Sequence, residues 1–500
     1  MKQHAVTLTP GSRADFTNNA MYCVGTGRMG LALHEEYQKQ LRAVRHVAPF
    51  EHIRGHGLFT DDMAIYRPWC DDEGVWHEGY NFTYLDRVMD SYLNMGIKPF
   101  LELGFMPEKM ASGTQTIFYW KGNTTPPAEE EKWTNMLKNV LRHLIDRYGY
   151  EEVASWPCEV WNEPNLPGFW ENADKAKYLR LYEISALAVK EVLPEMKVGG
   201  PAICGGQGSL EWIEDFLTFC RDKKLPLDFV TRHAYMGQST IRKGRYTYHE
   251  MCDVNYTYEE MKASREIIDR FPEYAGCDMH ITEYNTSYNP MCPIHDTNLN
   301  AAYIAGLLSC LGDVARSYSY WTFGDVFEEI GVPSLPFHGG FGMMANNLIP
   351  KPTLWTFHYF SHLQGECVHR DDKCVIVKNK DGSLEGVCWN LCREEKDALT
   401  LTLRLPDPQQ SYTLLTSLTD EDCCNPLKIW HDMGEPVSLK PDDVDFLRTA
   451  AQPMNASAKL EAGEDAAITL GRNGVCHFTL RPYRHEGEYG YDYEWYREHC

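Results

Sequence analysis

The sequence predicts a (β/α)8 barrel followed by an all-β sandwich. Between residues 21 and 323, short apolar strand patterns alternate with helical patterns until eight strands have appeared. These strands do not alternate between apolar and polar residues, and repeated βα units with such buried strands indicate a parallel sheet. After about residue 345 the pattern changes to alternating strands separated by Pro, Asp and Gly, which is typical of a sandwich. A doubly wound open sheet is the structural alternative for the first part.

The length of the chain accommodates both domains. It has 500 residues, of which 43% are hydrophobic, and a barrel takes about 250 residues or more. We expect the catalytic barrel at residues 15–345 and the sandwich at residues 346–500. A short alternating run within residues 1–14 could add one strand to the sandwich.

Each barrel element follows from its local pattern. The predicted strands cover residues 21–27, 52–57, 98–105, 159–163, 197–202, 228–235, 278–285 and 317–323. The predicted helices cover residues 31–47, 85–93, 129–148, 174–193, 209–222, 257–270 and 298–312, so every strand but the last is followed by a helix. The helices are recognised by apolar residues three and four positions apart, as at Leu85, Val88, Met89 and Tyr92.

The fourth strand carries the clearest chemical signal, the segment CEVWNEPNLPGFW at residues 158–170. It delivers Asn162 and Glu163 to the end of the strand, where a proline stops it. The aromatic residues Phe169 and Trp170 beyond it suggest a platform for a flat, hydroxylated ligand. Because an apolar wall raises the pKa of a carboxyl group beside it, Glu163 is a candidate general acid.

Polar and aromatic residues gather where the predicted strands end and not where they begin. In a (β/α)8 barrel the carboxyl ends of the strands form the active site. The residues concerned are Arg54, His56, Glu102, Asn162, Glu163, His233, Tyr235, Glu283, Asn285 and Trp321, with Asp325, Glu328 and Glu329 just beyond. This asymmetry favours a functional site over a random scatter.

Two carboxylates, Glu163 and Glu283, stand on strands four and seven, 120 residues apart. Glycoside hydrolysis needs one protonated and one ionised carboxyl group, in environments that separate their pKa values. Glu163 has aromatic neighbours, whereas Glu283 lies among the hydrogen-bonding residues His280, Thr282 and Tyr284. We therefore expect Glu163 to be the acid/base and Glu283 the nucleophile. The alternative for either is a structural carboxylate paired with Arg or His.

Five motifs make the chain similar to glycoside hydrolase family 39. The segment WNEP resembles the strand-four signature of the clan A glycosidases, which are retaining (β/α)8 enzymes. The motifs are HIRGHGLFTDDM at 52–63, YWKGNTTPP at 119–127, EVWNEPNLPGFW at 159–170, ITEYNTSY at 281–288 and YWTFGDVFEE at 320–329. They run in order from about residue 20 to 360 and are most similar to those of the β-xylosidases of that family.

The resemblance implies a retaining exo-glycosidase that removes terminal β-1,4-linked D-xylose from short xylo-oligosaccharides by double displacement. It implies that Glu163 is the acid/base, that Glu283 is the nucleophile and that Asn162 binds the sugar 2-hydroxyl. The other sugar-binding positions that it implies are His56, His233, Tyr235 and Glu329 around the terminal xylose, with Trp321 and Phe169 as aromatic walls. Glu328 is the alternative to Glu329. The chain departs from the family pattern at Arg232 and at Gly324.

Two other functions stay open. The first is hydrolysis of another glycoside by the same fold and mechanism, such as an α-L-arabinoside. The second is carbohydrate binding without catalysis, which the presence of both carboxylates disfavours. The α-L-iduronidases belong to the same family, but their substrate carries a carboxylate, and a net charge of −23 argues against it.

Composition sets the remaining expectations. The strong negative charge argues against nucleic acid or an anionic membrane as a partner. The N-terminal sequence lacks a signal-peptide pattern, and the 17 cysteines form no CxxC pair, so we expect a reducing cytoplasm. No HExxH motif or Asp/His ligand cluster is recognisable, so we expect no metal or cofactor. The expected partner is a small oligosaccharide, and related enzymes suggest a homo-oligomer such as a tetramer.

Overall fold

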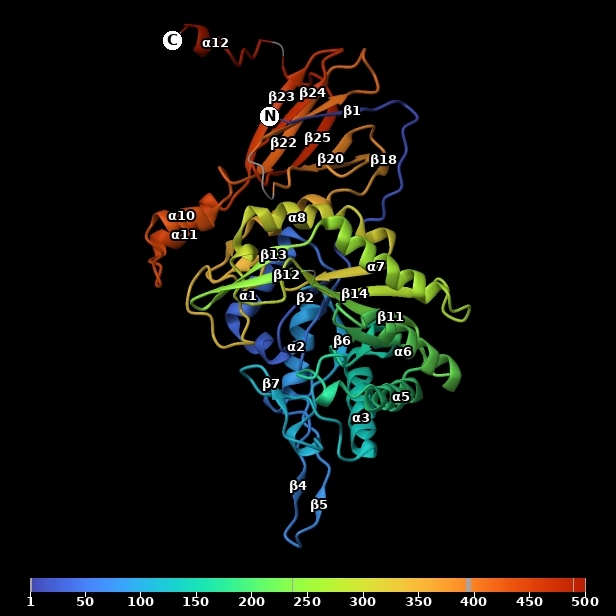
Figure 1. Cartoon of the computed structure of the whole chain (residues 1–500). Helices are drawn as coiled ribbons and strands as arrows, with labels where there is room; N and C mark the ends of the chain where they lie inside the picture. The colour runs from blue at the N-terminus through green and yellow to red at the C-terminus, as the bar shows by residue number, and fades with distance from the viewer. Residues whose placement is uncertain (1, 236, 393–396, 489, 500) are drawn as a thin grey trace.

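The computed structural model describes every residue except 1, 236, 393–396, 489 and 500. Eight parallel strands close into a barrel in the order β10-β11-β14-β15-β2-β3-β6-β9, which confirms the predicted fold class. The barrel strands are β2 (Cys23–Gly25), β3 (His52–Arg54), β6 (Lys98–Leu103), β9 (Cys158–Val160), β10 (Val198–Ile203), β11 (Phe229–Tyr235), β14 (Asp278–Asn285) and β15 (Ser317–Tyr320). A separate layer of strands lies above the barrel in the view of Figure 1.

A ring of helices surrounds the barrel. Its members are α1 (Glu35–Val47), α2 (Thr83–Asn94), α3 (Glu130–Tyr148) with the short α4 (Tyr150–Ala154), α5 (Lys175–Val192), α6 (Ser209–Lys223), α7 (Val254–Asp269), α8 (Asn298–Leu308) and α9 (Pro352–Ser361). The prediction that the last strand has no helix was wrong, because α9 follows β15 and packs against both α8 and α1. Pro352 occupies the first turn of α9, where its missing N–H costs nothing.

The fourth strand ends earlier than its sequence suggests. β9 stops at Val160, so Asn162 and Glu163 lie in the turn that follows it and not in the strand. Trp161 has φ +72° and Glu163 has φ +45°, a left-handed conformation that non-glycine residues rarely adopt. The backbone N–H of Glu163 donates a 2.9 Å hydrogen bond to the carbonyl of Ala202, which fixes this turn against the neighbouring strand β10.

Two antiparallel-rich sheets form the C-terminal sandwich. The larger has the order β18-β19-β20-β25-β22-β23, with β18 (Glu366–Arg370), β19 (Cys374–Lys378), β20 (Leu384–Trp389), β25 (Val475–Pro482), β22 (Tyr412–Thr419) and β23 (Met454–Leu460). The smaller has the order β1-β21-β24, with β1 (Lys2–Thr7), β21 (Leu399–Arg404) and β24 (Ala466–Leu470). β1 runs parallel to β21, and Val6 is buried with Leu401 and Phe478 in the core between the sheets.

Helix α8 shows how the two parts of the chain are joined. Every residue of α8 except the partly buried Leu299 is buried, and the helix contacts both β20 and β25 of the sandwich as well as α9 of the barrel. Its all-round apolar sequence therefore reflects a position between two packed layers. Among the described residues, no helix combines the length and apolarity needed to cross a membrane.

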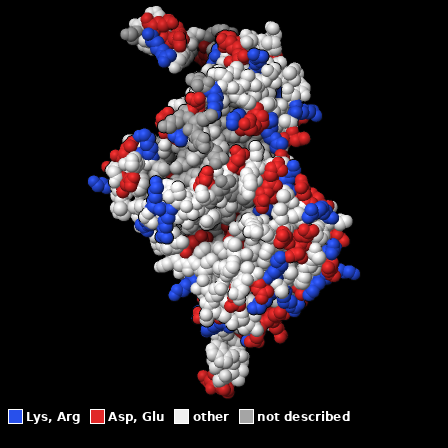
Figure 2. Space-filling model, in the orientation of Figure 1, with Lys and Arg blue, Asp and Glu red and all other residues white. Residues whose placement is uncertain are grey.

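Several segments are inserted between the main elements of the barrel and the sandwich. Helices α10 (Pro426–Asp432) and α11 (Pro441–Ala450) interrupt the sandwich between β22 and β23. Hairpin β12–β13 (Gly237–Lys243 and Tyr246–Met251) follows β11, and the small hairpin β7–β8 (Thr116–Ile117 and Gly122–Asn123) follows β6. Hairpin β4–β5 (Trp69–Cys70 and Trp76–His77) projects from the barrel in Figure 1. On the face shown in Figure 2, acidic and basic side chains are interspersed and form no single-sign patch.

Candidate active site

A cavity of about 420 Å³ opens at the carboxyl ends of the barrel strands. It is lined by His56, Ile117, Phe118, Asn162, Glu163, Leu166, Phe169, Cys204, Tyr235, Glu283, Tyr288, Pro290, Trp321, Glu329, Ile330 and Phe341. Eight of the nine site residues predicted from the sequence line this cavity, and the ninth, His233, contacts Glu163 directly. The barrel thus brings together residues that lie up to 285 positions apart in the chain, from His56 to Phe341.

Arg54 lies beneath this cavity and contacts four side chains around it. Its fully buried guanidinium donates hydrogen bonds to Glu159 at 2.6 Å, to Glu283 at 2.7 Å and to the Oδ1 atom of Asn162 at 2.9 Å. It also lies 2.9 Å from the Oε2 atom of Glu102. Because the amide oxygen of Asn162 is engaged by Arg54, the group left for a ligand hydroxyl is its NH2 donor.

Glu163 lies at the apolar side of the cavity. Its Oε1 atom is 2.8 Å from Nδ1 of His233, and the side chain is only 8% exposed. Burial raises the pKa of Glu163 well above its ordinary value, and the charge of Glu283 raises it further. Burial also holds the pKa of His233 well below its ordinary value, so this imidazole is neutral. The Nε2 atom of His233 is buried without a hydrogen-bond partner.

Glu283 is held by three polar neighbours. Its Oε2 atom accepts a 2.7 Å hydrogen bond from the hydroxyl of Tyr235, and its Oε1 atom accepts one from Arg54. The Nε2 atom of His56 is 3.4 Å away. Burial raises the pKa of Glu283, whereas His56, Arg54 and the Tyr235 hydrogen bond lower it. Since burial lowers the pKa of His56 to about 4, Arg54 supplies the lasting positive charge at neutral pH.

The two carboxyl groups face each other across a short gap. One carboxylate oxygen of Glu163, one of Glu283 and a ring nitrogen of His233 all lie within 4.8 Å of one another. Arg54 donates to Glu283, while the partner of Glu163 is a neutral imidazole. The first proton to leave this pair therefore leaves Glu283, and the remaining proton stays on Glu163. These three side chains could also ligate a cation, but their burial and their opposed protonation states suit acid–base chemistry better.

Aromatic side chains form the walls of the cavity. The ring of Trp321 lies 4.6 Å from that of His56, and it is backed by Gly25, where a Cβ atom would stand 2.5 Å from the indole. Phe169 packs edge-on against Phe118 with ring centroids 5.4 Å apart. Trp321 is 1% exposed, whereas Tyr288 and Ile330 at the rim are 55% and 60% exposed. The cavity therefore has a buried base and an open rim.

The structure distinguishes Glu329 from its neighbour Glu328. Glu329 lines the cavity, with Oε1 4.0 Å from Nε2 of His56, and burial raises its pKa well above the ordinary value. Glu328 instead accepts a 2.8 Å hydrogen bond from Arg28, outside the cavity. Glu329 is thus the member of the pair that can reach a ligand.

The two departures from the family pattern lie behind the barrel wall. Arg232 points outward, where it donates hydrogen bonds to the backbone carbonyl of Glu260 and to the hydroxyl of Ser264 on α7. It also forms an ion pair with the carboxylate of Glu260. A side chain at Gly324 would meet Gln40 at 2.3 Å. Neither residue lines the cavity. Their unusual identities therefore reflect packing between strands and helices and not the shape of the binding site.

Cys204 was missed as a residue of the site. It lines the cavity at the end of β10, and its thiol hydrogen-bonds Glu163. Its backbone N–H and carbonyl are both held by Asn165 at 2.9 Å. Burial raises its pKa, so the thiol is protonated. Its position one residue after strand β10 was the available signal, but small apolar neighbours made it look like core.

Known proteins resemble the chain in sequence and in overall fold. The family model described as glycosyl hydrolases family 39 matches residues 7–464. A "Beta-xylosidase" from Geobacillus stearothermophilus is 45% identical over 489 residues, covering 96% of each chain. A "Beta-xylosidase" from Caldicellulosiruptor saccharolyticus is 34% identical over 457 residues, covering 89% of this chain and 91% of the relative.

A solved structure extends the similarity to the whole fold. It is a monomeric beta-xylosidase from Caulobacter crescentus CB15, with a TM-score of 0.87 and 30% sequence identity. The superposition covers 96% of this chain and all of that chain. The barrel and the sandwich are therefore shared with this relative as one continuous fold.

Proposed function

The chain belongs to glycosyl hydrolase family 39 and is a glycoside hydrolase; we propose that it is a retaining exo-β-xylosidase. The observation that carries this proposal is the separation of Glu163 and Glu283, whose nearest ligating oxygens lie within 4.8 Å of each other. Retaining glycosidases place their carboxyl groups about 5–5.5 Å apart, whereas inverting enzymes leave about 6.5–9.5 Å for a water molecule.

In the first step, ionised Glu283 attacks the anomeric carbon of the terminal sugar. The bond between that carbon and the glycosidic oxygen breaks, and Glu163 gives its proton to the departing oxygen. Arg54 and Tyr235 orient the attacking carboxylate through their 2.7 Å hydrogen bonds. In this proposal the NH2 group of Asn162, whose amide oxygen is engaged by Arg54, donates a hydrogen bond to the sugar hydroxyl next to the reacting carbon.

In the second step, water releases the sugar from Glu283. Once Glu283 is esterified, its negative charge no longer raises the pKa of Glu163, so Glu163 loses its proton more easily. The resulting carboxylate takes a proton from water, and the hydroxyl oxygen bonds to the anomeric carbon. Glu283 leaves with its electron pair, and two displacements give net retention.

The shape of the cavity supports removal of a terminal sugar. Its base is formed by the buried residues Trp321, Phe341 and His56, so a chain cannot continue past it. Its rim carries exposed Tyr288 and Ile330, on which the remainder of the oligosaccharide can lie. The two curated relatives described above are named β-xylosidases, which supports xylose as the sugar at the base.

A panel of aryl glycosides tests the proposal, with β-D-xyloside, α-L-arabinoside and β-D-glucoside compared in wild type and in Glu283→Ala. We expect kcat/KM to be highest on the xyloside and to fall by several orders of magnitude in the variant. Glu328→Ala is the matched control, since this neighbouring acidic residue faces away from the cavity. A higher kcat/KM on the arabinoside would show that the substrate is an arabinoside and not a xyloside. Full activity in Glu283→Ala would show that Glu283 is not the nucleophile.

A further inference from the structure

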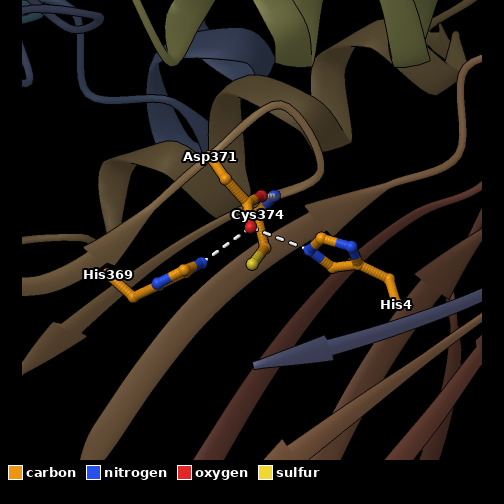
Figure 3. Close-up of side chains that lie close together, drawn as sticks. All are labelled: His4, His369, Asp371 and Cys374. Carbon is orange, nitrogen blue, oxygen red and sulfur yellow. Dashed lines mark hydrogen bonds and ion pairs between the residues drawn. The ribbon is translucent and has the colours of Figure 1, made fainter. Parts of the chain in front are cut away.

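A second cluster of chemically active side chains lies far from the active site, in the sandwich. It consists of His4, His369, Asp371 and Cys374, which we call the edge cluster. Figure 3 shows both imidazoles pointing toward the carboxylate of Asp371, with the sulfur of Cys374 between them. His4 lies 365 residues before His369 in the chain, so only the fold brings the four together.

The atoms of the edge cluster are arranged around one point. The Oδ2 atom of Asp371 lies 2.7 Å from Nε2 of His4 and 2.7 Å from Nε2 of His369. The sulfur of Cys374 and these three atoms all lie within 4.8 Å of one another. The Oδ1 atom of Asp371 accepts hydrogen bonds from the backbone N–H groups of Lys373 and Cys374 at 2.8 and 2.9 Å. The carboxylate is therefore fixed from behind, as metal-ligating carboxylates commonly are.

We propose that the edge cluster is a structural binding site for a zinc-class divalent transition-metal ion. Two imidazoles, a thiolate and a carboxylate form a four-ligand set that suits zinc, whereas calcium and magnesium require oxygen ligands. Zinc bonds of about 2.0–2.3 Å in a tetrahedron place ligand atoms about 3.4 Å apart. The two imidazole–carboxylate contacts would thus open by less than about 1 Å when the ion replaces their hydrogen bonds.

The edge cluster lies between the edge strands of the two sandwich sheets, where a bound ion would link the sheets. β1 is an edge strand of the smaller sheet and β18 is an edge strand of the larger one. His4 lies on β1, His369 lies on β18, and Cys374 begins β19. Exposed sheet edges are weak points in β structure. An ion bound here would fasten the two edges to each other and hold the beginning of the chain in the sandwich.

Two other groups of this kind among the described residues are weaker candidates. Glu163, His233 and Glu283 form the reacting centre described above. His362, Glu385 and His477 offer only three ligands, and the side chain of His362 is 45% exposed. The group of His362, Glu385 and His477 lies in the same part of the chain as the edge cluster and contains no cysteine, so it supplies a matched control.

Cobalt titration of the metal-stripped, untagged, full-length protein tests the site, because Co²⁺ replaces zinc and reports its ligands by absorption. We expect one equivalent to bind with Kd below about 1 µM, as is typical of structural sites. A thiolate-to-cobalt charge-transfer band should accompany the visible bands of tetrahedral Co²⁺. Cys374→Ser should abolish the charge-transfer band, and His369→Ala should weaken binding at least about 100-fold. His362→Ala should bind as wild type does.

Thermal melting supplies a second readout that does not depend on any one variant folding well. Added Zn²⁺ should raise the melting temperature of the wild type and of His362→Ala by several degrees, and chelation should reverse the change. Added Zn²⁺ should leave the melting temperatures of Cys374→Ser and His369→Ala nearly unchanged. Absence of stoichiometric binding by the wild type would overturn the proposal. Loss of binding in His362→Ala with retention in His369→Ala would equally overturn it, because the ion would then occupy the other group.

Discussion

The guanidinium of Arg54 donates a 2.7 Å hydrogen bond to Oε1 of Glu283, and both side chains are buried inside the barrel. Glu163, across the cavity, has the neutral imidazole of His233 as its partner instead. In a buried site an opposite charge strongly favours the ionised form of a carboxyl group. In the proposed mechanism, Arg54 therefore favours Glu283 as the carboxyl group that attacks and Glu163 as the one that holds the proton.

Substitution of Arg54 should shift the acidic limb of the pH–activity profile. Arg54→Met removes the positive charge, so the pKa of Glu283 should rise and activity should begin only at higher pH. Arg54→Lys keeps a charge and should shift the limb less. The measurement is kcat/KM for an aryl β-xyloside from pH 4 to 9. An acidic limb at the same pH in Arg54→Met as in wild type would show that Arg54 does not control the ionisation of Glu283.

Removal of the proposed general acid should depend on the leaving group. In Glu163→Ala, kcat/KM should fall by about 10²–10⁴ for xylobiose, whose leaving group needs a proton. For an activated aryl xyloside, which needs little protonation, the loss in kcat/KM should be much smaller. The alkaline limb of the pH profile should also disappear, because Glu163 is the group that must stay protonated. An equal loss on both substrates would contradict the assigned role.

Glu102 should make stability depend on pH. Burial raises its pKa to about 8, while Arg54 counters this. Below its unfolded pKa the carboxyl group is protonated in both states. Between about 4.5 and 8 the folded protein must take up a proton, which costs up to about 1.4 kcal/mol per pH unit. Glu102→Gln cannot ionise, so its melting temperature relative to wild type should rise as the pH increases from 5 to 8.

The control for this experiment is Glu131→Gln, a substitution of an exposed glutamate on α3. Its melting temperature should follow that of the wild type across the same pH range. A constant difference between Glu102→Gln and wild type at every pH would show that Glu102 is not protonated on folding.

A buried ion-pair network holds the segment that carries Glu329. The Nζ atom of Lys351 lies 2.6 Å from Asp296 and 2.7 Å from Asp325, and it donates to the carbonyl of Gly340. All three charged side chains are almost fully buried. Lys351→Met leaves two uncompensated carboxylates and should lower the free energy of unfolding by about 3–5 kcal/mol.

The matched control is Lys428→Met, which breaks an exposed pair with Asp432. Because exposed pairs contribute about 0–1 kcal/mol, its melting temperature should hardly change. Similar losses in the two lysine variants would contradict the stabilising role of the buried network.

The sequence predicted the barrel strands and most of the helices because both depend on local patterns. It also predicted eight residues that line the cavity, since they lie at or beyond the carboxyl ends of strands that must meet. The turn after β9 could not be predicted, because the left-handed conformations of Trp161 and Glu163 are imposed by contacts such as that with Ala202. Helix α9 was missed because its buried, apolar sequence lacks the one-sided pattern of a surface helix.

Side-chain partners were the least predictable feature. The four contacts of Arg54 depend on which side chains several separate strands turn into the barrel interior. Arg232 precedes the inward-facing His233 on β11, so strand alternation turns it outward, but its partner Glu260 on α7 is identified only by the fold. The edge cluster shows the same limit. His369, Asp371 and Cys374 form a local spacing that could have been noticed, but His4 joins them only when β1 returns to the sandwich.

The stereochemistry of hydrolysis tests the central claim most directly. Proton NMR of the first sugar released from an aryl β-D-xyloside, recorded before the anomers interconvert, distinguishes the two mechanisms. If Glu283 forms a covalent intermediate and Glu163 acts first as acid and then as base, the first product is β-xylose. Initial release of α-xylose would mean a single displacement by water, and it would contradict the roles assigned to both residues.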